Sequence, residues 1–342
     1  MLKSLLYSRF NPMPMLLPMR TAIALTGQRL ILVVYHTVCD EVPAHFRHLY
    51  QPRSVKLFTE DLQFLCRYYE PVDLTRLIEI TARREKPKKN LFFVSFDDGM
   101  SEFYTRAAPV LLKLGVPATC FLNSAFIDNN DLFYRYKVSI LIEGIQKHKE
   151  KKEFWQEFHG LKEKFGIPQG YYRKVLLHLD HNSVPFIDEA AKLIQIDFKD
   201  YLKQYKPYLS SDQIRELIAK GFTFGAHSIN HPDFRKLSDS EKKNQTLSSV
   251  EDVREKFALP HRVFAFPFTD YGIGKAFFDS VYGRGRVELS FGCAGIKRDS
   301  VQNNLQRIPM EDYKLSAVRR LKTDYFYYLL KSPFGKNLIR RF

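Results

Sequence analysis

The sequence predicts an α/β fold with a helical insertion, because short apolar runs alternate with helical patterns over residues 30–127 and 210–312. Between these stretches, Lys, Glu, Leu, Tyr and Phe recur at helical spacing with few strand signals. The alternation is typical of a βα barrel or of a doubly wound sheet. The predicted division is a basic segment over 1–29, a main domain over 30–313 with the insertion at about 128–209, and a basic, aromatic tail over 314–342.

Four apolar runs have the length of buried strands, and each is followed by a polar residue or a proline. They are 30–35 before His36, 91–96 before Asp97 and Asp98, 222–226 before His227, and 263–266 before Pro267. In parallel barrels, chemistry gathers at the carboxyl ends of the strands. The residues that follow these runs are therefore candidates for a functional site.

Helical patterns lie between the predicted strands, over 59–69, 103–114 and 212–220. The second pattern ends at Gly115 and the third at Gly221, as expected where helices stop.

The net charge of +15 is concentrated at the two ends of the chain. Residues 1–30 carry four basic and no acidic side chains, and residues 314–342 carry eight basic and one acidic, so the ends supply +11 as 4 + 7. Aromatic residues are interleaved with these charges, which is typical of a segment on an anionic membrane surface. The alternative is a pair of solvated faces on packed terminal helices. Nucleic acid is not an expected partner, since the usual binding modules are missing.

No apolar run approaches the length of about 20 residues that a transmembrane helix needs. The N-terminal stretch is broken by prolines and lacks a small-residue cleavage site, so we expect it to be retained. The four cysteines show no C-x-x-C spacing. These features favour a cytoplasmic protein, with peripheral membrane contact as a further expectation.

Two motifs indicate a metal site. Asp97 and Asp98 are adjacent acids after a buried strand, and a metal would offset their repulsion, although Asp-Asp-Gly alone also fits an ordinary turn. His227 and His231 are spaced so that both imidazoles can reach one ion. Two histidines and a carboxylate leave coordination positions open for water and substrate, as a catalytic site requires.

Two other histidine pairs carry less weight. His45 with His48, and His178 with His181, lack a partner at a strand end, and we expect them on the surface.

The successive motifs FVSFDDG, HSxxHP and FAFPF resemble those of the polysaccharide deacetylase family, also called the NodB-homology family or carbohydrate esterase family 4. The resemblance covers roughly residues 30–127 and 210–312. It implies a distorted (β/α) barrel with fewer than eight strands.

The resemblance also implies roles for individual residues. Asp97 would be the general base, and Asp98, His227 and His231 would hold the metal. Zinc is the first choice of metal, and cobalt, nickel and iron suit the same ligands. Around the third motif, Pro267, Phe268 and Asp270 are expected to contact the substrate, with a backbone N–H near Phe268 facing the oxyanion.

The sequence departs from the family pattern twice. The arginine that usually orients the base is replaced by Ala265, and Arg307 is the substitute that we would test. The usual late histidine acid is missing, and His36 is the natural replacement. His36 lies in YHTV, which resembles the YHxV start of deacetylases that act on exported poly-N-acetylglucosamine; the alternative is a histidine satisfied by backbone groups.

The predicted function is removal of the N-acetyl group from N-acetylhexosamine units of a surface polysaccharide or its lipid-linked precursor. One alternative is a barrel that has lost catalysis and binds a glycan or a biosynthetic partner. Another is a metal-dependent hydrolase of a different amide or ester, because loops decide the substrate. The sequence makes no prediction of acetyl position, glycan length or oligomeric state.

Overall fold

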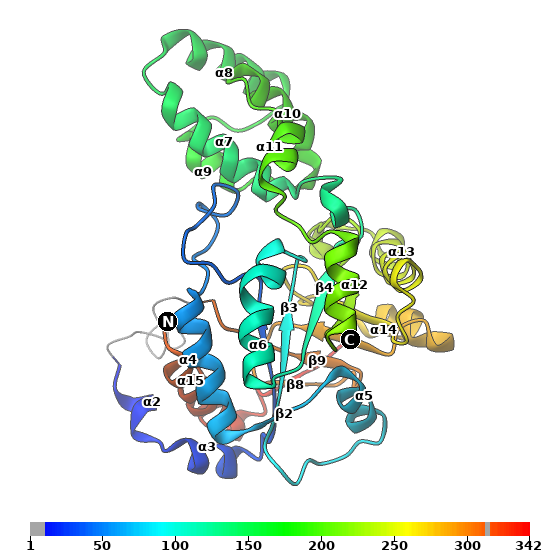
Figure 1. The fold of residues 1–342 in the computed structure, drawn as a ribbon. Coiled ribbons are helices and arrows are strands. Elements are labelled where there is room, and N and C mark those ends of the chain that lie inside the picture. Colours follow the sequence, from blue (N-terminus) through cyan, green and yellow to red (C-terminus); the bar gives the residue numbers. More distant parts are fainter. Residues whose placement is uncertain (1–10, 312–314) are drawn as a thin grey trace.

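The computed structural model describes residues 11–311 and 315–342 and shows a nearly closed parallel barrel surrounded by helices (Figure 1). The strand order is β10-β1-β3-β4-β5-β6-β7-β9, and a short β2 pairs with β3. The strands are β1 (Leu30–Tyr35), β2 (Glu70–Pro71), β3 (Leu91–Phe96), β4 (Ala118–Leu122), β5 (Thr223–Ala226), β6 (Val263–Ala265), β7 (Leu289–Gly292), β9 (Asn304–Gln306) and β10 (Ile308–Pro309).

One run of chain, residues 304–309, closes the barrel. Its first half, β9, pairs with β7, and its second half, β10, pairs with β1 at Val33 and Val34. Only Arg307 separates the two halves. With β9 and β10 counted as one interrupted strand, and without the short β2, seven described strands form the barrel. This number agrees with the prediction of fewer than eight. The barrel also decides against a doubly wound sheet, because the two ends of the sheet meet.

Large apolar side chains fill the barrel, among them Phe93, Phe121 and Phe291, none of which is exposed. Because strand residues alternate in direction, the other face of each strand packs against the surrounding helices. These helices are α4 (Val55–Tyr68), α5 (Leu74–Ala82), α6 (Ala108–Leu114), α12 (Ser211–Ala219), α13 (Asp239–Phe257) and α14 (Lys275–Tyr282).

The predicted strands 30–35 and 91–96 form at those positions, whereas two helices differ from the pattern. Helix α4 begins earlier than predicted, since the Ser54 hydroxyl accepts a hydrogen bond from the Leu57 N–H and caps it. The pattern over 103–114 divides into a π-helical turn, Phe103–Ala107, and α6.

The insertion is a separate bundle of helices at the end of the barrel where the strands finish (Figure 1). The two ends of the insertion lie together and are joined by Asn129. Its side-chain oxygen accepts from the Tyr208 N–H at 2.9 Å, and its side-chain nitrogen donates to the Tyr208 carbonyl at 3.1 Å. Its own core includes Leu141, Phe158 and Ile187. The helices are α7 (Tyr134–His148), α8 (Lys152–Lys164), α9 (Tyr172–Leu177), α10 (Val184–Leu193) and α11 (Phe198–Tyr205).

The described parts of the two basic ends pack against each other. They comprise α2 (Met13–Leu16) and α3 (Met19–Thr26) from one end, and α15 (Ala317–Lys331) and β11 (Leu338–Ile339) from the other; β11 pairs with β8 (Arg298–Asp299). The Lys322 ammonium donates to the Met15 carbonyl at 3.0 Å, and the Tyr325 hydroxyl donates to the Gln28 carbonyl at 2.6 Å. Part of the basic charge at the two ends of the chain therefore lies on terminal helices that pack against each other.

Contact with an anionic membrane stays a prediction. Residues 1–10 of the first predicted basic segment and residue 314 of the second lie outside the described residues. Among the residues described, none of the helices combines the length and the apolar character that crossing a membrane requires.

The close packing of β5 generates a stability prediction. A Cβ atom on Gly225 would lie 2.6 Å from a Val263 methyl and 2.8 Å from the Phe121 ring, whereas one on Gly160, in α8, would meet nothing within 4 Å. We expect Gly225→Ala to lower the free energy of unfolding by about 1–3 kcal/mol through overpacking. Gly160→Ala should raise it by up to about 1 kcal/mol, since alanine favours the helix. Urea unfolding of both variants checks this, and equal shifts would contradict the packing argument.

Candidate metal centre and active site

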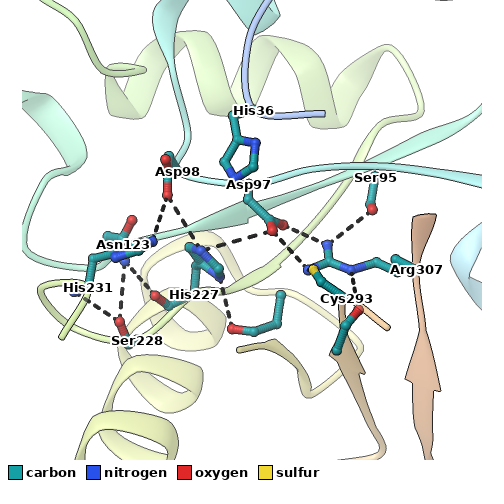
Figure 2. A network of polar contacts seen from close by, with 12 residues as sticks. His36, Ser95, Asp97, Asp98, Asn123, His227, Ser228, His231, Cys293 and Arg307 are labelled. Carbon is teal, nitrogen blue, oxygen red and sulfur yellow. Dashed lines mark hydrogen bonds and ion pairs between the residues drawn. The ribbon is translucent and has the colours of Figure 1, made fainter. Parts of the chain in front are cut away.

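The barrel brings the predicted site residues to one end, because the carboxyl ends of parallel strands meet there. His36 follows β1, Asp97 and Asp98 follow β3, and His227 follows β5. Figure 2 shows these side chains gathered together, although 191 residues separate His36 from His227 in the sequence (227 − 36).

Asp98, His227 and His231 form the only group of three metal-ligating side chains found in residues 11–311 and 315–342. One ligand atom from each lies within 4.8 Å of the other two. The Asp98 Oδ1 atom is 3.4 Å from His227 Nε2 and 3.3 Å from His231 Nε2. All three residues are buried.

These three residues fit a divalent metal. Two ligand atoms held at about 2.0–2.1 Å by one tetrahedral zinc lie roughly 3.4 Å apart, which matches the separations from Asp98. Asp98 Oδ1 is buried and has no hydrogen-bond partner within the described residues. Burial lowers the pKa of His227 to about 4 and that of His231 to about 3, so both imidazoles are neutral at neutral pH and can bind a metal.

The backbone around the ligands is held in an uncommon conformation. Asp98, Ser228 and His231 have φ angles of 71°, 72° and 58°, in the left-handed region that side chains other than glycine seldom adopt. Hydrogen bonds hold the turn between the histidines: the Ser228 hydroxyl accepts from the His231 N–H at 3.0 Å, and Asn123 donates to Ser228 and to the His227 carbonyl. Such strain typically marks functional sites.

Arg307 holds Asp97 by two parallel hydrogen bonds. The guanidinium donates to both oxygens of Asp97, at 2.7 and 2.8 Å, and is fully buried. Burial by itself would raise the pKa of Asp97, but the charge and hydrogen bonds of Arg307, together with the charges of His227 and His36, outweigh burial and lower the pKa to about 2. Arg307 therefore makes the contact that the sequence hypothesis requires of it, from the break between β9 and β10.

His36 is paired with Glu311. One Glu311 oxygen contacts His36 Nδ1, and the other accepts from the backbone N–H groups of His36 and Thr37 at 2.6 and 2.9 Å. Burial opposes protonation of His36, yet the Glu311 carboxylate raises its pKa to about 10. The imidazole is thus a charged donor at neutral pH, and it lies beside Asp97 in Figure 2. The alternative of a histidine satisfied by backbone groups does not describe this side chain.

Phe268 lies next to His231, and Pro267 precedes it in the chain. The Phe268 ring centroid is 4.6 Å from that of His231, and its φ is 56°. No described residue accepts a hydrogen bond from the Phe268 N–H. Pro267 is buried immediately before it. An oxyanion would find a free donor at Phe268, whereas substrate contact by either residue stays a prediction.

Asp270 requires a correction, because the structure gives it a different environment from the predicted substrate contact. Its side chain is 4% exposed and forms an ion pair with Arg341. The same carboxylate oxygen accepts from Asn304 at 2.7 Å and from Gln306 at 2.6 Å. Asp270 therefore ties the segment after β6 to β9 and to the tail, and its carboxylate is not available to a substrate.

The insertion contributes residues that sequence reasoning missed. The Tyr136 hydroxyl, from α7, donates to the second oxygen of Asp98 at 3.0 Å, and Phe133 packs against His231 with ring centroids 4.3 Å apart. Tyr50 lies 3.4 Å from the Tyr136 hydroxyl and 5.5 Å from the His36 ring, measured between centroids. No local signal marked these residues, since only tertiary packing brings them to the strand ends.

The expectation that His45 lies on the surface is wrong. His45 is 2% exposed, its Nδ1 is 2.9 Å from the Tyr201 hydroxyl, and its ring packs against Tyr136. Burial lowers its pKa to about 3, so it supports the insertion as a neutral side chain.

Comparisons with known proteins were consistent with this geometry. The family profile described as polysaccharide deacetylase matches residues 84–273, which is more than half of the 342 residues. Comparison with curated proteins gave no match.

Three solved structures share the fold. They are the deacetylase PplD of Streptococcus pyogenes in complex with acetate (15% identity, TM-score 0.55, covering 86% of this chain and 97% of that one), IcaB from Ammonifex degensii (16%, 0.54, 86% and 96%), and BC0361, a polysaccharide deacetylase from Bacillus cereus (14%, 0.52, 86% and 68%). At such identities the likeness shows the fold alone.

The His36–Glu311 pair generates a pH prediction. Glu311→Gln removes the charge that raises the His36 pKa, so we expect that pKa to fall from about 10 towards the ordinary value of about 6.5. Because a raised pKa favours folding of the protonated form, the pair stabilises the fold fully below about pH 6.5 and loses this effect as the pH rises towards 10. NMR titration of His36 in metal-free protein measures the shift. Glu143→Gln, which removes the partner of His48, is the matched control and should leave the His36 titration unchanged.

Proposed function

Because the chain belongs to the polysaccharide deacetylase family, we propose that it is a metal-dependent hydrolase that removes the N-acetyl group from N-acetylhexosamine units. The proposed substrate is a bacterial-type surface polysaccharide or its lipid-linked precursor. The observation that carries the proposal is a three-residue metal site beside an acid, Asp97, that is held by a buried arginine.

Asp98, His227 and His231 would hold the metal. When bound, a divalent metal supplies a water of lowered pKa and polarises the acetamide carbonyl. Zinc is the first choice, and cobalt, nickel or iron would suit the same nitrogen and oxygen ligands.

Asp97 is placed to act as the general base. It accepts a proton from the attacking water while the oxygen of that water forms a bond to the acetamide carbon. Arg307 donates to both Asp97 oxygens and so fixes the carboxylate without contacting the reacting atoms itself. The low pKa of Asp97 keeps it ionised and ready to accept the proton.

The remaining steps use Phe268 and His36. The free Phe268 N–H would donate to the oxyanion that forms from the carbonyl oxygen. When the carbon–nitrogen bond breaks, protonated His36 would give its proton to the departing sugar nitrogen, which leaves acetate and a free amine. Glu311 keeps His36 charged until that step.

The alternative of a barrel that only binds glycans rested on the missing arginine and the missing late histidine. Arg307 and His36 now supply a cation against Asp97 and a proton donor at the same end of the barrel, which supports the enzyme instead.

Acetate release tests the proposal. We expect the purified protein with zinc or cobalt to release acetate from chitooligosaccharides, and a chelator to abolish the release. Asp97→Asn should lower kcat by about 10²- to 10⁴-fold through loss of the base, and His36→Ala should also lower it strongly. Asp212→Asn, an exposed acid on α12, is the control and should keep full activity. Unchanged turnover in Asp97→Asn would rule out the assigned base.

A second prediction concerns metal affinity. Tyr136→Phe removes the hydrogen bond to Asp98, and loss of such an outer contact typically weakens metal binding by about 10- to 100-fold. A zinc competition titration measures the dissociation constant. Tyr104→Phe removes an exposed hydroxyl-to-carboxylate bond, to Glu216, and should leave the affinity unchanged. Equal affinities in wild type and Tyr136→Phe would mean that Tyr136 does not orient Asp98.

A further inference from the structure

Arg135 lies in the first turn of α7, at the point where the insertion reaches the active site. Its guanidinium carbon is 5.7 Å from the centroid of the Phe268 ring, and that ring lies 4.6 Å from the ring of His231. The charge of Arg135 is near enough to His231 to interact with it electrostatically. The side chain is half-buried rather than free in solvent. A cation is thus held at the rim of the proposed site.

No acid pairs with Arg135 within residues 11–311 and 315–342, and its guanidinium donates no hydrogen bond there. Two acids whose charges act on the neighbouring Tyr134 are engaged elsewhere, since Asp233 binds Arg235 at 2.6 Å and Asp180 binds Lys236 at 2.6 Å. Asp131, earlier in the same segment, lies 4.0 Å from Lys137. The planar guanidinium, 5.7 Å from the Phe268 ring centroid, therefore has N–H donors left for a ligand.

The chemistry of an arginine indicates what it would bind. Its fork of N–H groups matches the two oxygens of a carboxylate or a phosphate, and such charge-assisted bonds are stronger than neutral ones. The hydroxyl groups of a neutral sugar can accept hydrogen bonds from a guanidinium, but they leave its charge uncompensated, whereas a carboxylate or a phosphate does both. Phe133 packs against Phe268 and His231, so the half-buried guanidinium lies beside aromatic side chains, where a charge interaction is stronger than in bulk water.

We propose that Arg135 binds an anionic group, a phosphate or a carboxylate, carried by the sugar unit near its acetamide. The inference rests on the proposed deacetylation and narrows its substrate class to charged N-acetylated sugars. It also assigns a role to the insertion: Arg135, in the first turn of α7, would bind the charged group of the substrate while barrel residues carry out the hydrolysis.

Matched charged and neutral probes test this. We would measure KM and kcat for N-acetylglucosamine 1-phosphate, N-acetylmuramic acid and the neutral methyl glycoside of N-acetylglucosamine. We expect KM for at least one charged probe to be about tenfold or more below that of the neutral one. Preference for the phosphate or for the carboxylate distinguishes the two sources of charge. Equal KM values for all three probes would overturn the inference.

Variants separate recognition from packing. Arg135→Gln should raise KM for the preferred charged probe by about 10- to 100-fold and leave the neutral probe unchanged. Arg135→Lys keeps the charge and should restore part of the preference, more for phosphate than for carboxylate. Arg47→Gln, an exposed arginine paired with Glu143 of α7, is the control. A similar loss with charged and neutral probes in Arg135→Gln would show that the residue only packs on Phe268.

Calorimetry keeps the inference separate from the proposed reaction. The Asp97→Asn variant retains Arg135, and its affinity for N-acetylglucosamine 1-phosphate or N-acetylmuramic acid is measured against the neutral glycoside. Tighter binding of a charged probe that weakens with salt supports the inference even if no acetate is ever released. Equal affinities for charged and neutral probes would refute it even if deacetylation is established.

Discussion

The buried ion pair between Arg307 and Asp97 is the interaction on which the rest of this site depends. A guanidinium without exposure to water is strongly destabilising unless its charge and its N–H groups are satisfied. Asp97 accepts from two of its nitrogens, and Ser95 and the Gly292 carbonyl accept further bonds. Arg307 also lies where β9 ends and β10 begins, so the residue that holds Asp97 belongs to the same run of chain that closes the barrel.

Surroundings divide the histidines of the site into two chemical types. For His227 and His231 the effect of burial outweighs that of the nearby acids, so their imidazoles stay neutral and suit metal binding. His36 faces Glu311 and stays protonated, which suits a proton donor. One end of the barrel thus holds neutral ligands and a charged acid close together, and the difference comes from neighbours rather than from the side chains themselves.

The helical insertion is part of the site as well as a separate bundle. It has its own core, yet several of its side chains reach the site. Phe133, just before α7, packs against His231, and the first turn of α7 places Arg135 near Phe268 and Tyr136 against Asp98. The barrel places Asp97, Asp98 and His227 after strand ends, and the insertion packs against this end of the barrel through contacts such as Tyr136 with Asp98. The proposed binding of an anionic group by Arg135 would give the insertion a part in the choice of substrate.

The sequence by itself determined the alternation of strands and helices, the strands over 30–35 and 91–96, and the acids and histidines that follow strand ends, because each is a local pattern of side chains along a few residues. It also pointed to Arg307 through the alanine at position 265, although only as a substitute to test. Tertiary structure alone decided that Glu311 charges His36 from 275 residues away, that Tyr136 supports Asp98, that Asp270 is taken up by Arg341, and that His45 is buried. These contacts depend on how the barrel closes and where the insertion packs. Local sequence patterns do not predict them, because the partners are far apart in the chain.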